Sequence, residues 1–230
     1  MSASRTPGSR WSALLFDLDG TLADTIGLIL TCYRHTMRVH LGRELPDREW
    51  LDTLGMPLRD QLRRFARSDQ EVQAMLATYS AYQRQIHDGM VAAYPGVREV
   101  LEQLASAGTP MGVVTSKRRE MSERTLRCCG LAEFFAVLVS ADDVASGKPD
   151  PEPVAFALRA LGSLAAETVL FVGDSPFDVT AGRLAGVRTA AALWGAFPRE
   201  VLEAAGPDYF VAGIAEVLSL GGADSRRAGG

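Results

Sequence analysis

Several patterns are scarce or missing in this chain of 230 residues, and each absence excludes a class of protein. The three cysteines, Cys32, Cys128 and Cys129, are odd in number and two are adjacent, so they do not form a disulfide framework. The sequence has no Cys-x-x-Cys pair or histidine cluster for zinc, and no Gly-x-Gly-x-x-Gly or Walker loop for a nucleotide cofactor. We expect reduced cysteines in the core of a cytoplasmic protein.

Long apolar runs and a basic excess are also missing. No apolar stretch approaches the roughly 18–20 residues of a membrane span, and residues 1–10 lack the hydrophobic region of a secretory signal. The net charge of −4 argues against general affinity for nucleic acid or acidic membranes. The two ends, 1–10 and 221–230, are rich in small and polar residues, and we expect them to be disordered tails.

Two kinds of pattern divide the remaining chain. Short apolar runs alternate with helical periodicity from residue 94 onwards, and a first apolar run precedes Asp17; the expected strands are 14–16, 111–115, 135–139, 168–172, 187–193 and 208–211. Between residues 23 and 89 we find no convincing strand, and the expected helices there are 24–42, 47–54, 58–65 and 69–88.

This alternation predicts an α/β fold, a doubly wound parallel (Rossmann-like) sheet with helices on both faces. The sheet domain comprises residues 11–22 and 94–220. An all-helical cap, residues 23–93, is inserted after the first strand. Linkers near 22–25 and 90–95 join the two parts, and we expect the cap to open and close on them.

Polar side chains follow four of the predicted strands. Ligands bind at the carboxyl ends of the strands in such sheets, so we expect these residues to converge there: Asp17, Asp19, Thr115, Ser116, Lys148, Asp174 and Asp178. Asp17 and Asp19 would share one face if the first strand ran on through both. We expect the Lys117-Arg118-Arg119 run to be an exposed helix start, with an approach of Lys117 to the site as the alternative.

The residue types at this edge suit phosphoryl transfer. Asp17, Asp19 and Asp174 form a set of hard oxygen ligands, without histidine or cysteine, that suits Mg²⁺. Lys148 and hydroxyl groups can hold phosphate oxygens. One carboxylate can act as nucleophile, and a second, two residues on, can protonate the leaving oxygen.

The same stretches resemble the haloacid dehalogenase superfamily, in particular its phosphatases with a helical cap after the first strand, which include phosphoglycolate phosphatases and pyrophosphatases. The resemblance covers residues 11–220. Its motifs are, in order, Asp17-Leu18-Asp19-Gly20-Thr21-Leu22, Val114-Thr115-Ser116-Lys117, Gly147-Lys148-Pro149-Asp150-Pro151 and Val172-Gly173-Asp174-Ser175 with Asp178.

The resemblance implies a role for each matching residue. Asp17 is the nucleophile and Asp19 the general acid and base. Magnesium is held by Asp17, the backbone carbonyl of Asp19 and Asp174, with Asp178 in support. Thr115, the backbone at Ser116 and Lys148 bind the transferring phosphoryl group. An acid at position 19 argues for phosphoryl transfer, because dehalogenases and phosphonate-cleaving members lack one there.

The cap is expected to select the substrate, through the loop 53–59 and the helix end 85–88. Arg59 or His87 would read an anionic leaving group. We expect a magnesium-dependent phosphatase of a small phosphorylated metabolite such as 2-phosphoglycolate, active as a monomer or homodimer. Pyrophosphate hydrolysis is an alternative, followed by a β-phosphoglucomutase-like transferase and a non-catalytic binding relative.

Overall fold

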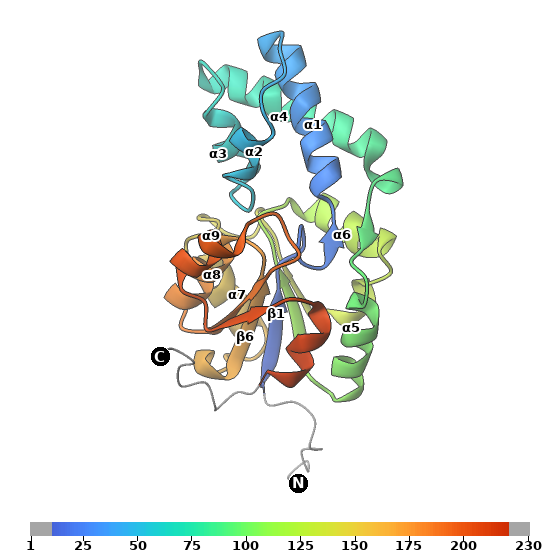
Figure 1. Ribbon diagram of the computed structural model, residues 1–230, viewed down its shortest axis with the longest axis vertical. Coiled ribbons are helices and arrows are strands. Elements are labelled where there is room, and N and C mark those ends of the chain that lie inside the picture. Colours follow the sequence, from blue (N-terminus) through green and yellow to red (C-terminus); the bar gives the residue numbers. More distant parts are fainter. Residues whose placement is uncertain (1–10, 221–230) are drawn as a thin grey trace.

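The computed structural model describes residues 11–220; the predicted tails, 1–10 and 221–230, lie outside the described residues. Its centre is a parallel sheet of six strands in the order β5-β4-β1-β6-β7-β8 (Figure 1). The strands are β1 (Ala13–Phe16), β4 (Met111–Val114), β5 (Val137–Val139), β6 (Val169–Gly173), β7 (Arg188–Ala192) and β8 (Tyr209–Val211). This order confirms the doubly wound α/β fold and places β1 between β4 and β6, where the winding changes direction.

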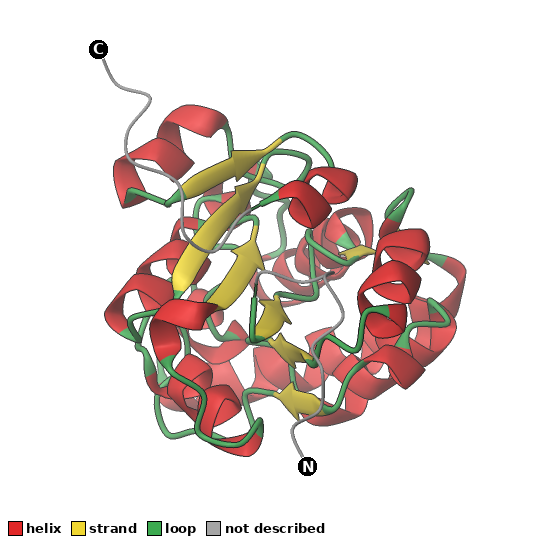
Figure 2. Cartoon of the chain, turned by 90° about the horizontal axis from the view of Figure 1, so that it is seen from below, coloured by secondary structure: helices red, strands yellow, loops and turns green. Residues whose placement is uncertain are grey.

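The central strands are apolar on both faces because helices cover the sheet from both sides (Figure 2). Leu14 and Phe16 pack into one apolar cluster, and Ala13 and Leu15 pack into another on the opposite face. The flanking helices are α5 (Val97–Ser106), α6 (Arg119–Cys128), α7 (Glu152–Ala160), α8 (Pro176–Leu184) and α9 (Arg199–Ala205). Every residue of β1, β4 and β6 is buried, so the sheet is a rigid base for the groups at its strand ends.

Four helices gather beyond one edge of the sheet (Figure 1). They are α1 (Ile26–Leu41), α2 (Arg48–Leu51), α3 (Leu58–Arg63) and α4 (Asp69–Ile86), and we call them the cap helices. Tyr33 stacks on Trp50 at 4.6 Å between ring centroids, and Phe65 and Tyr79 stack around the same indole, so these helices share an apolar interior. The division into a core of 11–22 and 94–220 and a cap of 23–93 stays a prediction.

Two local features differ from the prediction. The linkers contain strands, β2 (Ala23–Asp24) and β3 (Ala92–Ala93), which pair antiparallel; two residues are too few to give an alternating pattern. The first strand ends at Phe16, so it does not run through both aspartates. The chain turns at Gly20, whose φ of +87° favours glycine.

The sequence pattern predicts a closing helix over residues 213–219, and the structure has a helix of a different type there, the 3₁₀ helix η4 (Ile214–Ser219). Within residues 11–220, none of the helices has both the length and the apolar character that a membrane span requires.

Candidate active site

A buried lysine connects two acids at the carboxyl ends of the central strands. The Nζ atom of Lys148 donates to Asp17 Oδ1 at 2.8 Å, to Asp178 Oδ1 at 2.5 Å and to the carbonyl oxygen of Val114 at 3.3 Å. Lys148 and Asp178 are 1% exposed and Asp17 is 3% exposed. All three ammonium hydrogens are therefore used inside the protein, and the charge is paired where water does not reach it.

Burial and charge act against each other in this pair. Burial raises the pKa of Asp17 well above the ordinary carboxyl range, although the charge of Lys148 partly offsets this. Burial alone would lower the pKa of Lys148, but the charges of Asp17 and Asp178 outweigh it and the pKa is raised. The lysine therefore stays protonated, and the acids gain from any further positive charge placed beside them.

Asp174 is fixed by two hydrogen bonds at the end of β6. Its Oδ1 accepts from Thr21 Oγ1 at 3.0 Å and its Oδ2 from the backbone N–H of Ala196 at 3.0 Å. Burial first, and then the charge of Asp178, raise the pKa of Asp174 to about 7. Gly20 closes on this carboxylate so tightly that a side chain there would collide with it.

Asp178 lies in the first turn of α8 and is oriented by its helix cap. Its Oδ2 accepts from the backbone N–H of Ser175 at 3.0 Å and from Ser175 Oγ at 2.6 Å, which completes a capping box. The carboxylate oxygens of Asp17, Asp174 and Asp178 lie within 4.8 Å of one another. This all-oxygen, three-carboxylate set fits a hard divalent cation.

The side chain of Asp19 lies outside that set of three acids. Its Oδ1 accepts from Thr25 Oγ1 at 2.6 Å and from Lys117 Nζ at 2.7 Å. The side chain of Lys117 is 7% exposed, so an exposed helix start is wrong for this residue and the alternative, an approach of Lys117 to the site, is the one that the structure supports.

Thr115 and Ser116 lie at the end of β4, as the strand pattern predicts. Thr115 is buried, and its Oγ1 accepts from the backbone N–H of Lys117 at 3.2 Å. Ser116 Oγ donates to the carbonyl oxygen of Gly55 at 2.6 Å and thereby connects the sheet to the loop between α2 and α3. The φ of Gly55 is +100°, and a Cβ atom there would lie 2.7 Å from Ser175 Oγ. This loop is therefore seated directly on the strand ends.

A cavity of about 1360 Å³ lies between the cap helices and these strand ends. Asp17, Asp19, Thr115, Ser116, Lys117 and Lys148 line it from the sheet side. Arg59, from α3, lines it from the cap side; it is exposed and forms no ion pair with any residue that the structure describes.

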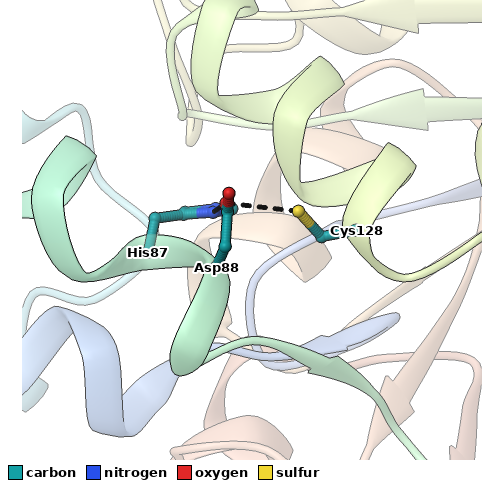
Figure 3. Close-up of side chains that lie close together, drawn as sticks. All are labelled: His87, Asp88 and Cys128. Carbon is teal, nitrogen blue, oxygen red and sulfur yellow. Dashed lines mark hydrogen bonds and ion pairs between the residues drawn. The ribbon is translucent and has the colours of Figure 1, made fainter.

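His87 is not among the residues that line this cavity, and its predicted position is wrong. It belongs to the 3₁₀ helix η1 (His87–Gly89), which turns it away from the cavity toward α6. The imidazole is fully buried, with Nε2 at 2.8 Å from Thr125 Oγ1 and Nδ1 at 2.8 Å from Asp88 Oδ1. Cys128 joins this group from α6 (Figure 3); it is exposed, which contradicts the expectation that all three cysteines lie in the core.

Fold and site together define a hydrolytic enzyme of the α/β class, with buried acids at the carboxyl ends of its strands. The family model described as haloacid dehalogenase-like hydrolase matches residues 14–192. The chain belongs to this family.

Named relatives extend the similarity over nearly the whole chain. A putative pyrophosphatase PpaX from Caldanaerobacter subterraneus is 41% identical over 209 residues, covering 91% of this chain and 94% of that protein. A pyrophosphatase PpaX from Halalkalibacterium halodurans is 35% identical, covering 94% of this chain and 99% of that protein.

Solved structures show the same fold. A putative haloacid dehalogenase-like hydrolase from Bacteroides fragilis superposes with a TM-score of 0.84 at 24% identity, covering 90% of this chain and 99% of the other. A putative phosphoglycolate phosphatase from Lactobacillus plantarum gives a TM-score of 0.81 at 28% identity, covering 91% and 98%.

Proposed function

We propose that this enzyme is a magnesium-dependent phosphohydrolase that transfers the phosphoryl group of a small substrate to Asp17 and then to water. The observation that carries the proposal is the arrangement of Asp17. It is buried at the strand end, bonded through Oδ1 to Lys148, and lies beside Asp174 and Asp178. Such a carboxylate is oriented for attack on a phosphorus atom held in the cavity.

In the first step Asp17 Oδ2 attacks phosphorus, and the bond from phosphorus to the leaving oxygen breaks. Asp19, two residues on and lining the same cavity, supplies the proton that the leaving oxygen takes up. In the second step Asp19 takes a proton from water, the water oxygen attacks phosphorus, and the bond between phosphorus and Asp17 breaks. Thr115 and the backbone at Ser116 hold the phosphoryl oxygens, while Lys148 keeps Asp17 in position.

The acid cluster is where Mg²⁺ would bind. Asp17 and Asp174, with the backbone carbonyl of Asp19, are the proposed ligands; Asp178 lies close enough to support them. A bound Mg²⁺ would neutralise the acids and polarise the phosphoryl oxygens.

Inorganic pyrophosphate and 2-phosphoglycolate are the first substrates to test. Relatives at 41% and 35% identity carry the name pyrophosphatase, which favours pyrophosphate. One structural neighbour, at 28% identity, is described as a putative phosphoglycolate phosphatase. Both substrates are small anions with an anionic leaving group. A transferase like β-phosphoglucomutase would isomerise a sugar phosphate instead of releasing phosphate, and a non-catalytic relative would do neither. A cytoplasmic location and a monomeric or homodimeric state stay predictions.

The test is phosphate release from pyrophosphate, 2-phosphoglycolate and p-nitrophenyl phosphate with Mg²⁺, before and after addition of EDTA. Asp17→Asn should lower kcat by at least about 10³-fold on every substrate, because the nucleophile is lost. Asp52→Asn, at an exposed position after α2, is the matched control and should retain wild-type rates. Wild-type rates in Asp17→Asn, or activity that survives EDTA, would contradict the proposal.

A further inference from the structure

The site contains two lysines with opposite surroundings. Lys148 gives its three ammonium hydrogens to Asp17, Asp178 and the carbonyl of Val114. Lys117 gives one hydrogen to Asp19, and among residues 11–220 no other acceptor is bonded to its Nζ atom. Both side chains are almost fully enclosed, at 1% and 7% exposed. Lys117 therefore carries two N–H donors without a protein partner, among the described residues, in a nearly closed site.

The neighbours of Lys117 show that this placement is not a general property of the basic run. Arg118 points outward to Asp142, with its side chain 73% exposed, and Arg119 pairs with Asp143 and is 41% exposed. Lys117 is the only one of the three whose side chain is almost fully enclosed; Arg118 also borders the cavity, but with its side chain exposed to solvent. Enclosing a charge with one partner is costly unless a further partner arrives.

The distribution of charge in the site allows an anion to bind beside Lys117. Asp17, Asp174 and Asp178 cluster around Lys148, whereas Asp19 and Lys117 form a separate pair 2.7 Å apart. In the proposed reaction Asp19 is the residue that protonates the leaving oxygen. Any group that reaches Asp19 with its leaving oxygen also comes within reach of the ammonium bonded to it.

We propose that Lys117 binds the leaving group and selects substrates in which that group is itself an anion, a phosphate or a carboxylate. The proposal rests on the proposed function, because it takes the leaving group to lie at Asp19. The two open N–H donors of Lys117 bond to anionic oxygens one or two atoms beyond the scissile bond, while Thr115 and the backbone at Ser116 hold the transferring group. A charge-assisted bond of this kind, made in a nearly closed site, contributes strongly to affinity.

The test measures binding, so it does not depend on turnover. Methylenediphosphonate has the second anionic group that inorganic phosphate lacks, and both are titrated calorimetrically with Mg²⁺ present. In Lys117→Met, which keeps the side-chain length, the Kd of methylenediphosphonate should rise about 10- to 100-fold, and that of phosphate less than about 3-fold. Lys117→Arg should restore part of the lost affinity.

Arg127→Met is the matched control, because it removes a positive charge of α6 that does not line the cavity and whose side chain is 64% exposed. It should change the Kd of methylenediphosphonate by less than about 2-fold, since an exposed ion pair contributes little. Kinetics should agree: Lys117→Met raises KM for pyrophosphate or 2-phosphoglycolate more than for p-nitrophenyl phosphate, whose nitrophenyl group carries no phosphate or carboxylate.

Equal weakening of both ligands in Lys117→Met would overturn the proposal, because the lysine would then act on the transferring phosphoryl group. Unchanged binding of both would overturn it as well. A wild-type protein that binds methylenediphosphonate through Lys117 but hydrolyses none of the three substrates would contradict the proposed function and leave the binding role standing.

Discussion

The two walls of the cavity differ in how firmly their side chains are held. On the sheet side, Lys148 and Asp178 have all their charged atoms bonded within the protein, and Asp174 is held from both of its oxygens. On the cap side, Arg59 is exposed and has no ion pair within the described residues. Under the proposed function, the groups that carry out the chemistry are therefore already held in place by the sheet, whereas the groups that would recognise the rest of the substrate gain partners only when it binds.

The cap helices are nevertheless not loosely packed. Trp50 is fully buried and stacked against Tyr33 and Tyr79, so the interior of this region is ordered. The loop at Gly55 connects the cap helices to the candidate active site, because its carbonyl oxygen accepts from Ser116 and it packs against Ser175.

The largest losses of stability and activity should come from removing the charge of Lys148 on the sheet side of the cavity. Lys148→Met leaves Asp17 and Asp178 buried without their shared cation, which should cost about 3–5 kcal/mol of unfolding free energy and lower kcat by at least about 10³-fold. Urea unfolding without metal and hydrolysis of p-nitrophenyl phosphate with Mg²⁺ measure the two effects.

Arg59→Met is the comparison on the cap side. It should raise KM for an anionic substrate by up to about 10-fold, with unfolding free energy within about 0.5 kcal/mol of wild type. Equal losses of kcat and stability in the two variants would show that the cavity walls do not differ as described.

A smaller effect is expected at the contact between the walls. In Gly55→Ala the new Cβ meets Ser175 Oγ at 2.7 Å, which should lift the loop and lower kcat/KM about 10-fold on pyrophosphate or 2-phosphoglycolate. The φ of +100° adds backbone strain of about 1–2 kcal/mol.

Gly42→Ala is the control that separates backbone strain at a positive φ from the collision with Ser175 expected in Gly55→Ala. Gly42 has a φ of +69° at the end of α1, and nothing lies within 4 Å of the position that a Cβ atom would take there. The variant should lose comparable stability and keep full activity. A similar loss of activity in both variants would mean that the seating of the Gly55 loop is unimportant for catalysis.

The sequence predicts the sheet side of the site better than the cap side, for a physical reason. Parallel strands bring their carboxyl ends to one edge whatever the loops do, so Asp17, Thr115 and Asp174 could be placed together from strand positions alone. Lys148 lies in the loop that follows β5, so the same argument places it at this edge of the sheet. The roles of these residues stay proposals, although the structure places Asp17, Thr115 and Lys148 along one cavity and Asp174 beside Asp17.

Side-chain directions that depend on how helices and loops pack against one another could not be predicted in this way. Lys117 begins a basic run of the kind that is usually solvated, so the sequence left open whether it faces solvent or the site; in the structure it turns inward and bonds to Asp19. His87 follows a long helix at the predicted end, but η1 directs it to α6 instead of the cavity. The strands β2 and β3 have two residues each and leave no periodic pattern.

The smallest effect concerns His87, at the joint where the end of the cap helices meets α6. Burial lowers its pKa, only partly offset by Asp88, so the folded protein favours the neutral imidazole. The unfolded chain takes up a proton near its ordinary pKa of about 6.5. The resulting stabilisation is therefore present above about pH 6.5 and is lost progressively as the pH falls below it.

His87→Gln keeps a hydrogen-bonding group toward Thr125 but removes this proton uptake. Unfolding free energies from urea titrations at about pH 7 and about pH 5 should fall less between the two pH values in the variant than in wild type. Asp88, whose pKa is lowered first by Arg124 and then by His87, stays ionised at both pH values with Arg124 as its remaining partner, so the difference of the two pH effects reports on His87. Parallel losses in the two proteins would show that the joint between cap helices and α6 does not depend on a neutral imidazole. The neutral form would then contribute nothing to the contact that holds the cap helices beside the sheet.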